Sequence, residues 1–109
     1  MNIIGDIKGK NCILIDDMID TAGTICNAVE ALFNLGAKSV SACATHAVLS
    51  GPAIERLEKS SLEEVILLDT ILLGEDKILD KFKILSVAPL FAEVMIRIHR
   101  NDSVSKMFD

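Results

Sequence analysis

One stretch of the sequence decides the fold, namely Ile13-Leu14-Ile15-Asp16-Asp17-Met18-Ile19-Asp20-Thr21-Ala22-Gly23-Thr24. It starts as an apolar run, passes through three carboxylates, and ends in a turn that leads into a helical pattern. Continuous apolar runs are typical of buried parallel strands, so residues 11–16 are predicted to form one. Open α/β sheets bind ligands beyond the carboxyl ends of their strands, and Asp16 and Asp17 are therefore expected to border a ligand site.

The start of the helix that follows is suited to binding a phosphate group. The first N–H groups of a helix lack intrahelical partners and lie at the positive end of its dipole, so an anion placed there satisfies both. Gly23 lacks a Cβ that would keep an oxygen from the backbone, and Thr21 and Thr24 add hydroxyl groups. The preceding carboxylates would accept hydrogen bonds from sugar hydroxyls or bind a hydrated Mg²⁺. In the alternative interpretation Asp20 or Thr21 merely caps the helix, which leaves the neighbouring acids unexplained.

The remaining periodicities predict a single three-layer α/β domain with a mostly parallel sheet and helices on its faces. A helix at 23–35 followed by a strand at 40–45 completes a βαβ unit, which is expected to be right-handed. The other predicted elements are a short helix that starts at Ser50-Gly51-Pro52, strands at 64–68 and 83–87, a polar loop or single helical turn at 74–77, and a helix that starts at Pro89 and carries an apolar stripe.

Composition excludes several classes of protein. The net charge of −5 provides no basic stripe for nucleic acid, and no apolar run reaches the length of a membrane span, so neither partner is expected. Cys12, Cys26 and Cys43 lie in apolar runs without metal-ligand spacing, which predicts reduced thiols in a cytoplasmic protein. Half of the 109 residues are apolar, and we expect some apolar surface to face another subunit or a further part of the polypeptide.

These motifs resemble those of a known family. The apolar run, the two acids and Asp20–Thr24 are similar to the phosphoribosyl-binding motif of the type I phosphoribosyltransferase fold. The segments Gly5–Lys10, Thr45–Ala53 and Ser103–Phe108 narrow the resemblance to the C-terminal half of ribose-phosphate pyrophosphokinases (phosphoribosyl pyrophosphate synthetases). Residues 1–109 would then form the C-terminal phosphoribosyltransferase-like domain, and the N-terminal half of the parent enzyme would be absent.

The resemblance implies an activity and a set of site residues. Such synthetases transfer diphosphate from ATP to ribose 5-phosphate with the help of Mg²⁺, giving phosphoribosyl pyrophosphate and AMP for nucleotide biosynthesis, and they assemble into homo-oligomers. The matching serines, Ser103 and Ser105, would bind phosphate groups of allosteric effectors. The residues implied for ribose 5-phosphate are Asp20, Thr21, Ala22, Gly23 and Thr24 for the 5-phosphate, and Asp16 and Asp17 for the ribose hydroxyls, with a Mg²⁺ shared by these two acids.

The departures from the family set further expectations. The adenine platform, the metal-binding histidine and aspartate, and the mobile basic loop are absent, and Lys8 and Lys10 do not replace that loop. We therefore expect no catalytic residue in this chain and no activity from it alone. His46 is expected to satisfy a backbone hydrogen bond. The alternatives are a base phosphoribosyltransferase, for which the tail after Val87 leaves little room for a base-binding hood, and a non-catalytic regulatory subunit of the synthetase.

Overall fold

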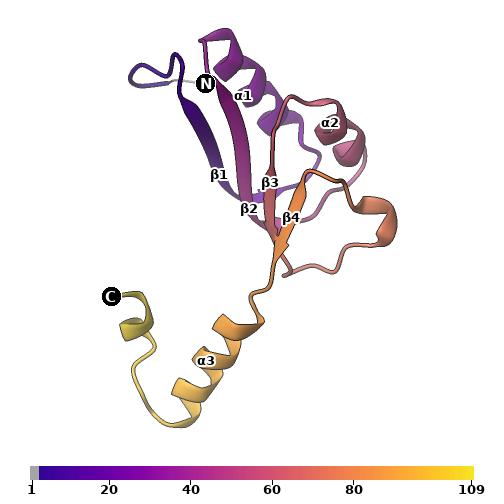
Figure 1. The fold of residues 1–109 in the computed structure, drawn as a ribbon. Coiled ribbons are helices and arrows are strands. Elements are labelled where there is room, and N and C mark those ends of the chain that lie inside the picture. Colours follow the sequence, from indigo (N-terminus) through magenta and orange to yellow (C-terminus); the bar gives the residue numbers. More distant parts are fainter. Residues whose placement is uncertain (1–2) are drawn as a thin grey trace.

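The computed structural model describes residues 3–109 and shows an α/β fold built on one parallel sheet (Figure 1). The sheet has the strand order β1-β2-β3-β4, and each neighbouring pair is parallel, which confirms the predicted fold class. The elements are β1 (Asn11–Ile19), α1 (Gly23–Asn34), β2 (Ser39–Ala47), α2 (Ala53–Lys59), β3 (Val65–Leu68), η1 (Glu75–Lys77), β4 (Phe82–Leu85), α3 (Ala88–His99) and η2 (Ser105–Phe108).

The first strand is longer than the sequence predicted. Its pairing with β2 places Asp16 opposite Ala44 and continues to Ile19 opposite Ala47. The predicted end of the strand at residue 16 is therefore too early, because Asp17, Met18 and Ile19 also lie within β1. The strand continues past the acids because β2 extends beside it and supplies backbone partners. The polar turn consequently starts at Asp20, one residue after the strand.

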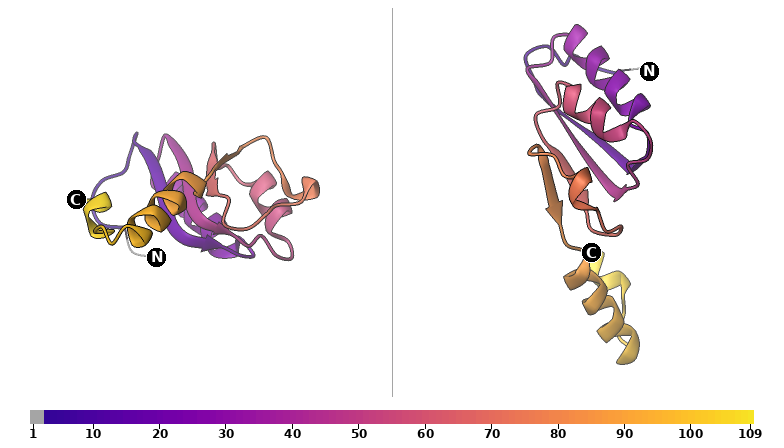
Figure 2. Two further views of the ribbon diagram at one scale, coloured as in Figure 1. Left: turned by 90° about the horizontal axis from the view of Figure 1, so that it is seen from below. Right: turned by 90° about the vertical axis from the view of Figure 1, so that its right-hand side faces the viewer.

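The core lies between one face of the sheet and the helices α1 and α2, which lie beside one another (Figure 2). Val40 and Val65 from the sheet, Leu57 from α2 and Val29 from α1 are all at most 1% exposed. The short residues of β2, which include Ala42, leave space for these larger side chains against the sheet. This packing fixes the positions of the helices, and with them the loops at the carboxyl ends of β1 and β2.

The opposite face of the sheet has no covering layer among residues 3–109. Alternate residues of β1 point to this face, and Ile13 and Ile15 are 64% and 83% exposed. Ile66 and Leu68 of β3 are half-buried on the same face. The prediction of a three-layer domain is thus wrong for the described chain, which has two layers.

The last helix projects away from the sheet (Figures 1 and 2). The Cα radius of gyration is 16.6 Å, well above the value of about 13 Å that is typical of a compact domain of this length. The predicted apolar stripe of α3 contributes nothing to the core, and Phe91 and Met95 are 54% and 69% exposed. Amphipathic periodicity correctly indicated a helix, but within residues 3–109 its apolar side is not buried against the sheet.

A single carboxylate fixes the corner between β4 and α3. Asp69 accepts a hydrogen bond at Oδ1 from the N–H of Val87 (2.8 Å), and its own N–H donates to the carbonyl of Leu85 (3.1 Å). The Val87 N–H, together with the Ser86 side chain, lowers the pKa of the Asp69 carboxyl. These contacts attach the end of the sheet to the start of α3.

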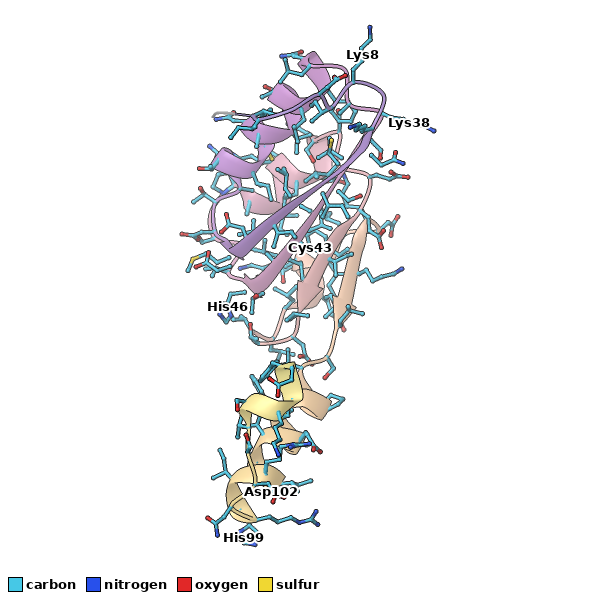
Figure 3. The ribbon with its side chains drawn as sticks, turned by 90° about the vertical axis from the view of Figure 1, so that its left-hand side faces the viewer. Lys8, Lys38, Cys43, His46, His99 and Asp102 are labelled. Carbon is cyan, nitrogen blue, oxygen red and sulfur yellow. The ribbon has the colours of Figure 1, made fainter. Side chains whose placement is uncertain are left out.

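Composition made two predictions about residues 3–109, one on the cysteines and one on membrane-spanning helices. Cys12, Cys26 and Cys43 are free thiols, as predicted, although they are half-buried and not enclosed in the core. Cys43 lies on β2, one of the two inner strands of the sheet (Figure 3). Within the described range, no helix combines the length and apolar character that crossing a bilayer would require.

Candidate functional site

A hollow at the junction of β1 and α1 gathers most of the predicted site residues. Of the residues predicted to bind ribose 5-phosphate, Asp17 is the one that does not line it. Sequence reasoning missed Met18, Ile19 and Ile25, because an apolar residue beside a motif carries no polar signal of its own. The residues that line the hollow are Asp16, Met18, Ile19, Asp20, Thr21, Ala22, Gly23, Thr24 and Ile25.

The backbone N–H groups at this junction are unpaired. Within residues 3–109, no hydrogen bond is donated by the N–H groups of residues 21–25, and the first bond of α1 runs from Cys26 N–H to the Ala22 carbonyl (3.1 Å). Ala22 is the N-cap residue, in the left-handed conformation with φ of 67°, and no side chain caps the helix. The alternative that Asp20 or Thr21 caps α1 is therefore wrong. Free N–H groups at the positive end of a helix dipole are well suited to an anion.

The loop is held in place from the end of β2. The Asp20 carbonyl accepts a hydrogen bond from Ser50 N–H (3.0 Å), and the Ile19 carbonyl accepts one from Leu49 N–H (3.0 Å). The Ser50 hydroxyl also donates to Oδ1 of Asp20. The segment Ser50-Gly51-Pro52, predicted as the start of a helix, thus also supports the turn that precedes α1.

Asp16 presents a charged carboxylate to the hollow. Its Oδ1 accepts a hydrogen bond from Asp17 N–H (2.7 Å). Hydrogen bonds from the side chain and backbone of Asp17 lower the pKa of Asp16. Asp16 is therefore ionised at neutral pH and can accept hydrogen bonds from hydroxyl groups.

The acids of the described chain do not form a complete metal site by themselves. Among residues 3–109, no group of three or more His, Cys, Asp or Glu side chains is arranged to hold a metal ion. Magnesium in phosphate sites keeps several waters and takes only one or two protein carboxylates together with substrate oxygens. The donor set at Asp16 and Asp17 fits a cation of this shared kind.

His46 lies at the carboxyl end of β2 (Figure 3). Its Nδ1 is 2.8 Å from the hydroxyl of Thr70, which also lies 3.2 Å from the carbonyl of Thr45. The expected backbone partner is thus replaced by a side chain. Because the single Thr70 hydrogen points to the Thr45 carbonyl, the Thr70 oxygen accepts a hydrogen bond from Nδ1 of His46.

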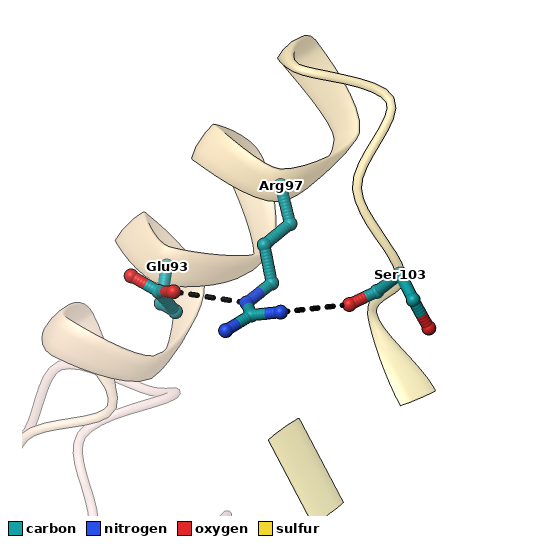
Figure 4. A network of polar contacts seen from close by, with 3 residues as sticks. All are labelled: Glu93, Arg97 and Ser103. Carbon is teal, nitrogen blue, oxygen red and sulfur yellow. Dashed lines mark hydrogen bonds and ion pairs between the residues drawn. The ribbon is translucent and has the colours of Figure 1, made fainter. Parts of the chain in front are cut away.

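The two C-terminal serines lie in the part of the chain that follows α3, away from the sheet (Figure 1). Arg97 donates to the carbonyl of Ser103 (2.9 Å) and to Glu93 (2.9 Å), as Figure 4 shows. The Ser103 and Ser105 hydroxyls are 3.0 Å apart. Ser103 lies in the segment that leads from α3 to η2, and Ser105 is the first residue of the short 3-10 helix η2.

Comparisons with known proteins give a consistent result. The chain is 65% identical to a ribose-phosphate pyrophosphokinase of Clostridium acetobutylicum and 63% identical to one of Caldanaerobacter subterraneus, each over 99% of this chain and 34% of the relative. The crystal structure of phosphoribosylpyrophosphate synthetase from Mycobacterium smegmatis matches with a TM-score of 0.87 and 49% identity, over 90% of this chain and 33% of that one.

The chain therefore spans about a third of the length of the relatives that it matches. Its sequence also matches a family described as the phosphoribosyl synthetase-associated domain over residues 1–109, which is the whole chain. On this match, the protein belongs to the phosphoribosyl synthetase-associated domain family.

Proposed function

We propose that the chain binds ribose 5-phosphate as one domain of a ribose-phosphate pyrophosphokinase. The observation that carries this proposal is the row of unpaired N–H groups at residues 21–25, beside a hollow bordered by carboxylates. The 5-phosphate would accept hydrogen bonds from these N–H groups and from the hydroxyls of Thr21 and Thr24. Asp16 would accept hydrogen bonds from the ribose hydroxyls, with Asp17 beside it.

The parent enzyme would transfer diphosphate from ATP to ribose 5-phosphate and release phosphoribosyl pyrophosphate and AMP. This part of the proposal rests on the names of the relatives, which are ribose-phosphate pyrophosphokinases and not base phosphoribosyltransferases. A Mg²⁺ at Asp16 and Asp17, when bound, would neutralise negative charge on substrate oxygens. The domain's own contribution is to bind and orient the sugar phosphate, and alone it should release no AMP from ATP, Mg²⁺ and ribose 5-phosphate.

The place of the domain in the parent chain is also a proposal. The resemblance of its motifs supports a position in the C-terminal half, while the 34% of the relative that the match covers gives the size of the match and not its position. Sequencing the reading frame that encodes the segment tests this. An upstream extension homologous to the relatives is expected, and a long extension downstream of Asp109 would instead place the segment near the N-terminus.

Further protein should cover the apolar side chains that the described chain leaves exposed. Ile15 on the open sheet face and Met95 on α3 are 83% and 69% exposed. Side chains of this kind are normally buried in an interface, which supports assembly of the parent into a homo-oligomer or close packing between its domains. Ser103 and Ser105 are proposed to bind phosphate of an effector in that assembly.

Titration of the ¹⁵N-labelled chain with ribose 5-phosphate tests the binding site directly. We expect the amide resonances of residues 21–25 to shift, because their N–H groups would gain acceptors. Ribose without its phosphate serves as the control ligand and should leave these resonances unchanged. A well-dispersed spectrum in which the amides do not respond to ribose 5-phosphate would contradict the proposed site.

A further inference from the structure

Arg56 contacts the loop that precedes α1, although it belongs to none of the motifs that predicted the site. Arg56 lies on α2, and its Nη1 donates a hydrogen bond to the carbonyl of Thr21 (3.2 Å), across 35 positions of sequence. Leu57, the next residue of α2, is fully buried in the core, so the helix that carries the guanidinium has a fixed position. Arg56 therefore contacts the site directly, and its backbone position is fixed because α2 packs against the core.

The geometry of the peptide group gives this contact a consequence in the hollow. The Thr21 carbonyl and the Ala22 N–H belong to the same planar trans peptide, in which the C=O and N–H groups point in opposite directions. Holding the carbonyl toward α2 therefore turns the Ala22 N–H away from α2. Ala22 lines the hollow, and its N–H has no protein acceptor among residues 3–109.

Gly23 provides the space for this arrangement. A Cβ built on Gly23 would lie 3.0 Å from Nη1 of Arg56. The sequence explained this glycine by close approach of a ligand oxygen, but the Cβ position is directed at the guanidinium. A methyl group at position 23 would therefore make the guanidinium that holds the Thr21 carbonyl give way by a few tenths of an ångström.

We propose that Arg56 is a positioning residue for ribose 5-phosphate, which it never touches, acting through the Thr21–Ala22 peptide. This inference rests on the proposed function. By holding the Thr21 carbonyl, the guanidinium fixes the direction of the Ala22 N–H, which would bind the phosphate. Ser50 holds the other end of the same turn through its hydrogen bonds to Asp20. Loss of Arg56 would leave that peptide free to rotate, so the N–H would no longer be oriented before the phosphate arrives.

The test compares Arg56→Gln with Lys59→Gln in the full-length synthetase that carries this segment. Lys59 lies on the same helix and its replacement loses the same charge, but it pairs with Glu55 (2.7 Å) and, among residues 3–109, makes no hydrogen bond to the loop. We expect Arg56→Gln to raise the KM for ribose 5-phosphate roughly tenfold, as for loss of one positioned hydrogen bond, with the KM for ATP unchanged. Lys59→Gln should leave both constants unchanged, and Arg56→Lys, which keeps a donor, should recover part of the loss.

Several outcomes would overturn the inference. Equal KM values in the wild type and Arg56→Gln would do so, as would an equal rise in both KM values, which indicates a general structural role. If Arg56→Gln does not fold, Arg56→Met, which keeps the unbranched apolar part of the side chain but has no donor, provides a second variant; an unchanged KM for ribose 5-phosphate would then refute the inference. A wild-type enzyme that binds no ribose 5-phosphate would refute the proposed function as well, which distinguishes the two failures.

Discussion

Replacement of Leu57 by alanine tests whether α2 anchors the domain. Leu57 is fully buried between α2 and the sheet, and truncation of such a leucine removes its transfer free energy and leaves a cavity. The expected loss is about 3 kcal/mol in the free energy of unfolding, which is a large part of the stability of a small domain. In urea this corresponds to a fall of about 2 M in the transition midpoint, for a dependence of about 1.5 kcal/mol per M.

Leu90→Ala is the matched control, because the chemical change is identical. Leu90 lies on the projecting helix α3 and is 42% exposed, so its truncation should cost less than about 1 kcal/mol. Urea unfolding of the chain followed by circular dichroism measures both variants. Leu57→Met, which nearly conserves volume, should cost less than about 1.5 kcal/mol and keeps the comparison available if the alanine variant does not fold. A loss at Leu90 equal to that at Leu57 would refute the assignment of the core.

Three further predictions concern the corner, a turn and the sugar. In the folded chain the pKa of Asp69 is lowered from its ordinary value of 3.8. The ionised carboxylate therefore stabilises the fold above pH 3.8, and this stabilisation is lost as the pH falls through the lowered pKa of the folded state. Asp69→Asn should therefore melt earlier than wild type at pH 6, with a smaller difference at pH 3; an equal difference at both would contradict this. Gly36→Ala should destabilise the chain by at least about 1 kcal/mol in urea unfolding, because φ is +95° and the new Cβ would meet Cγ of Lys8 at 3.0 Å; an unchanged midpoint would disprove the strain. Asp16→Asn should weaken ribose 5-phosphate binding in calorimetry more than binding of inorganic phosphate, because the carboxylate faces the sugar, and equal losses would argue against that role.

Most of the fold near the site could be predicted because its signals are local. The apolar run before Asp16 and the helical spacing after Gly23 each report on one element, and the parallel pairing follows from joining them. The strand end could not be placed, because β1 extends as far as β2 supplies partners. Pairing partners are a property of the tertiary structure, which one segment of sequence does not encode.

Neither the number of layers in the domain nor the contact that supports the loop before α1 could be predicted from the sequence. The apolar residues of α3 predicted a helix with a buried side, yet Phe91, Met95 and Ile98 on that side are more than half exposed in the described chain. Arg56 carries no signal in sequence, since it contacts Thr21 only because α2 packs beside α1. The sequence likewise explained only part of the role of Gly23, because a Cβ at this position would meet Arg56, which lies far along the chain.

The most direct test of the central claim is a crystal structure of the chain with ribose 5-phosphate bound. We expect the 5-phosphate oxygens at about 3 Å from backbone nitrogens within residues 21–25, with the sugar on the side of Asp16. Density for the phosphate at another site, with these N–H groups bonded to protein carbonyls, would contradict it.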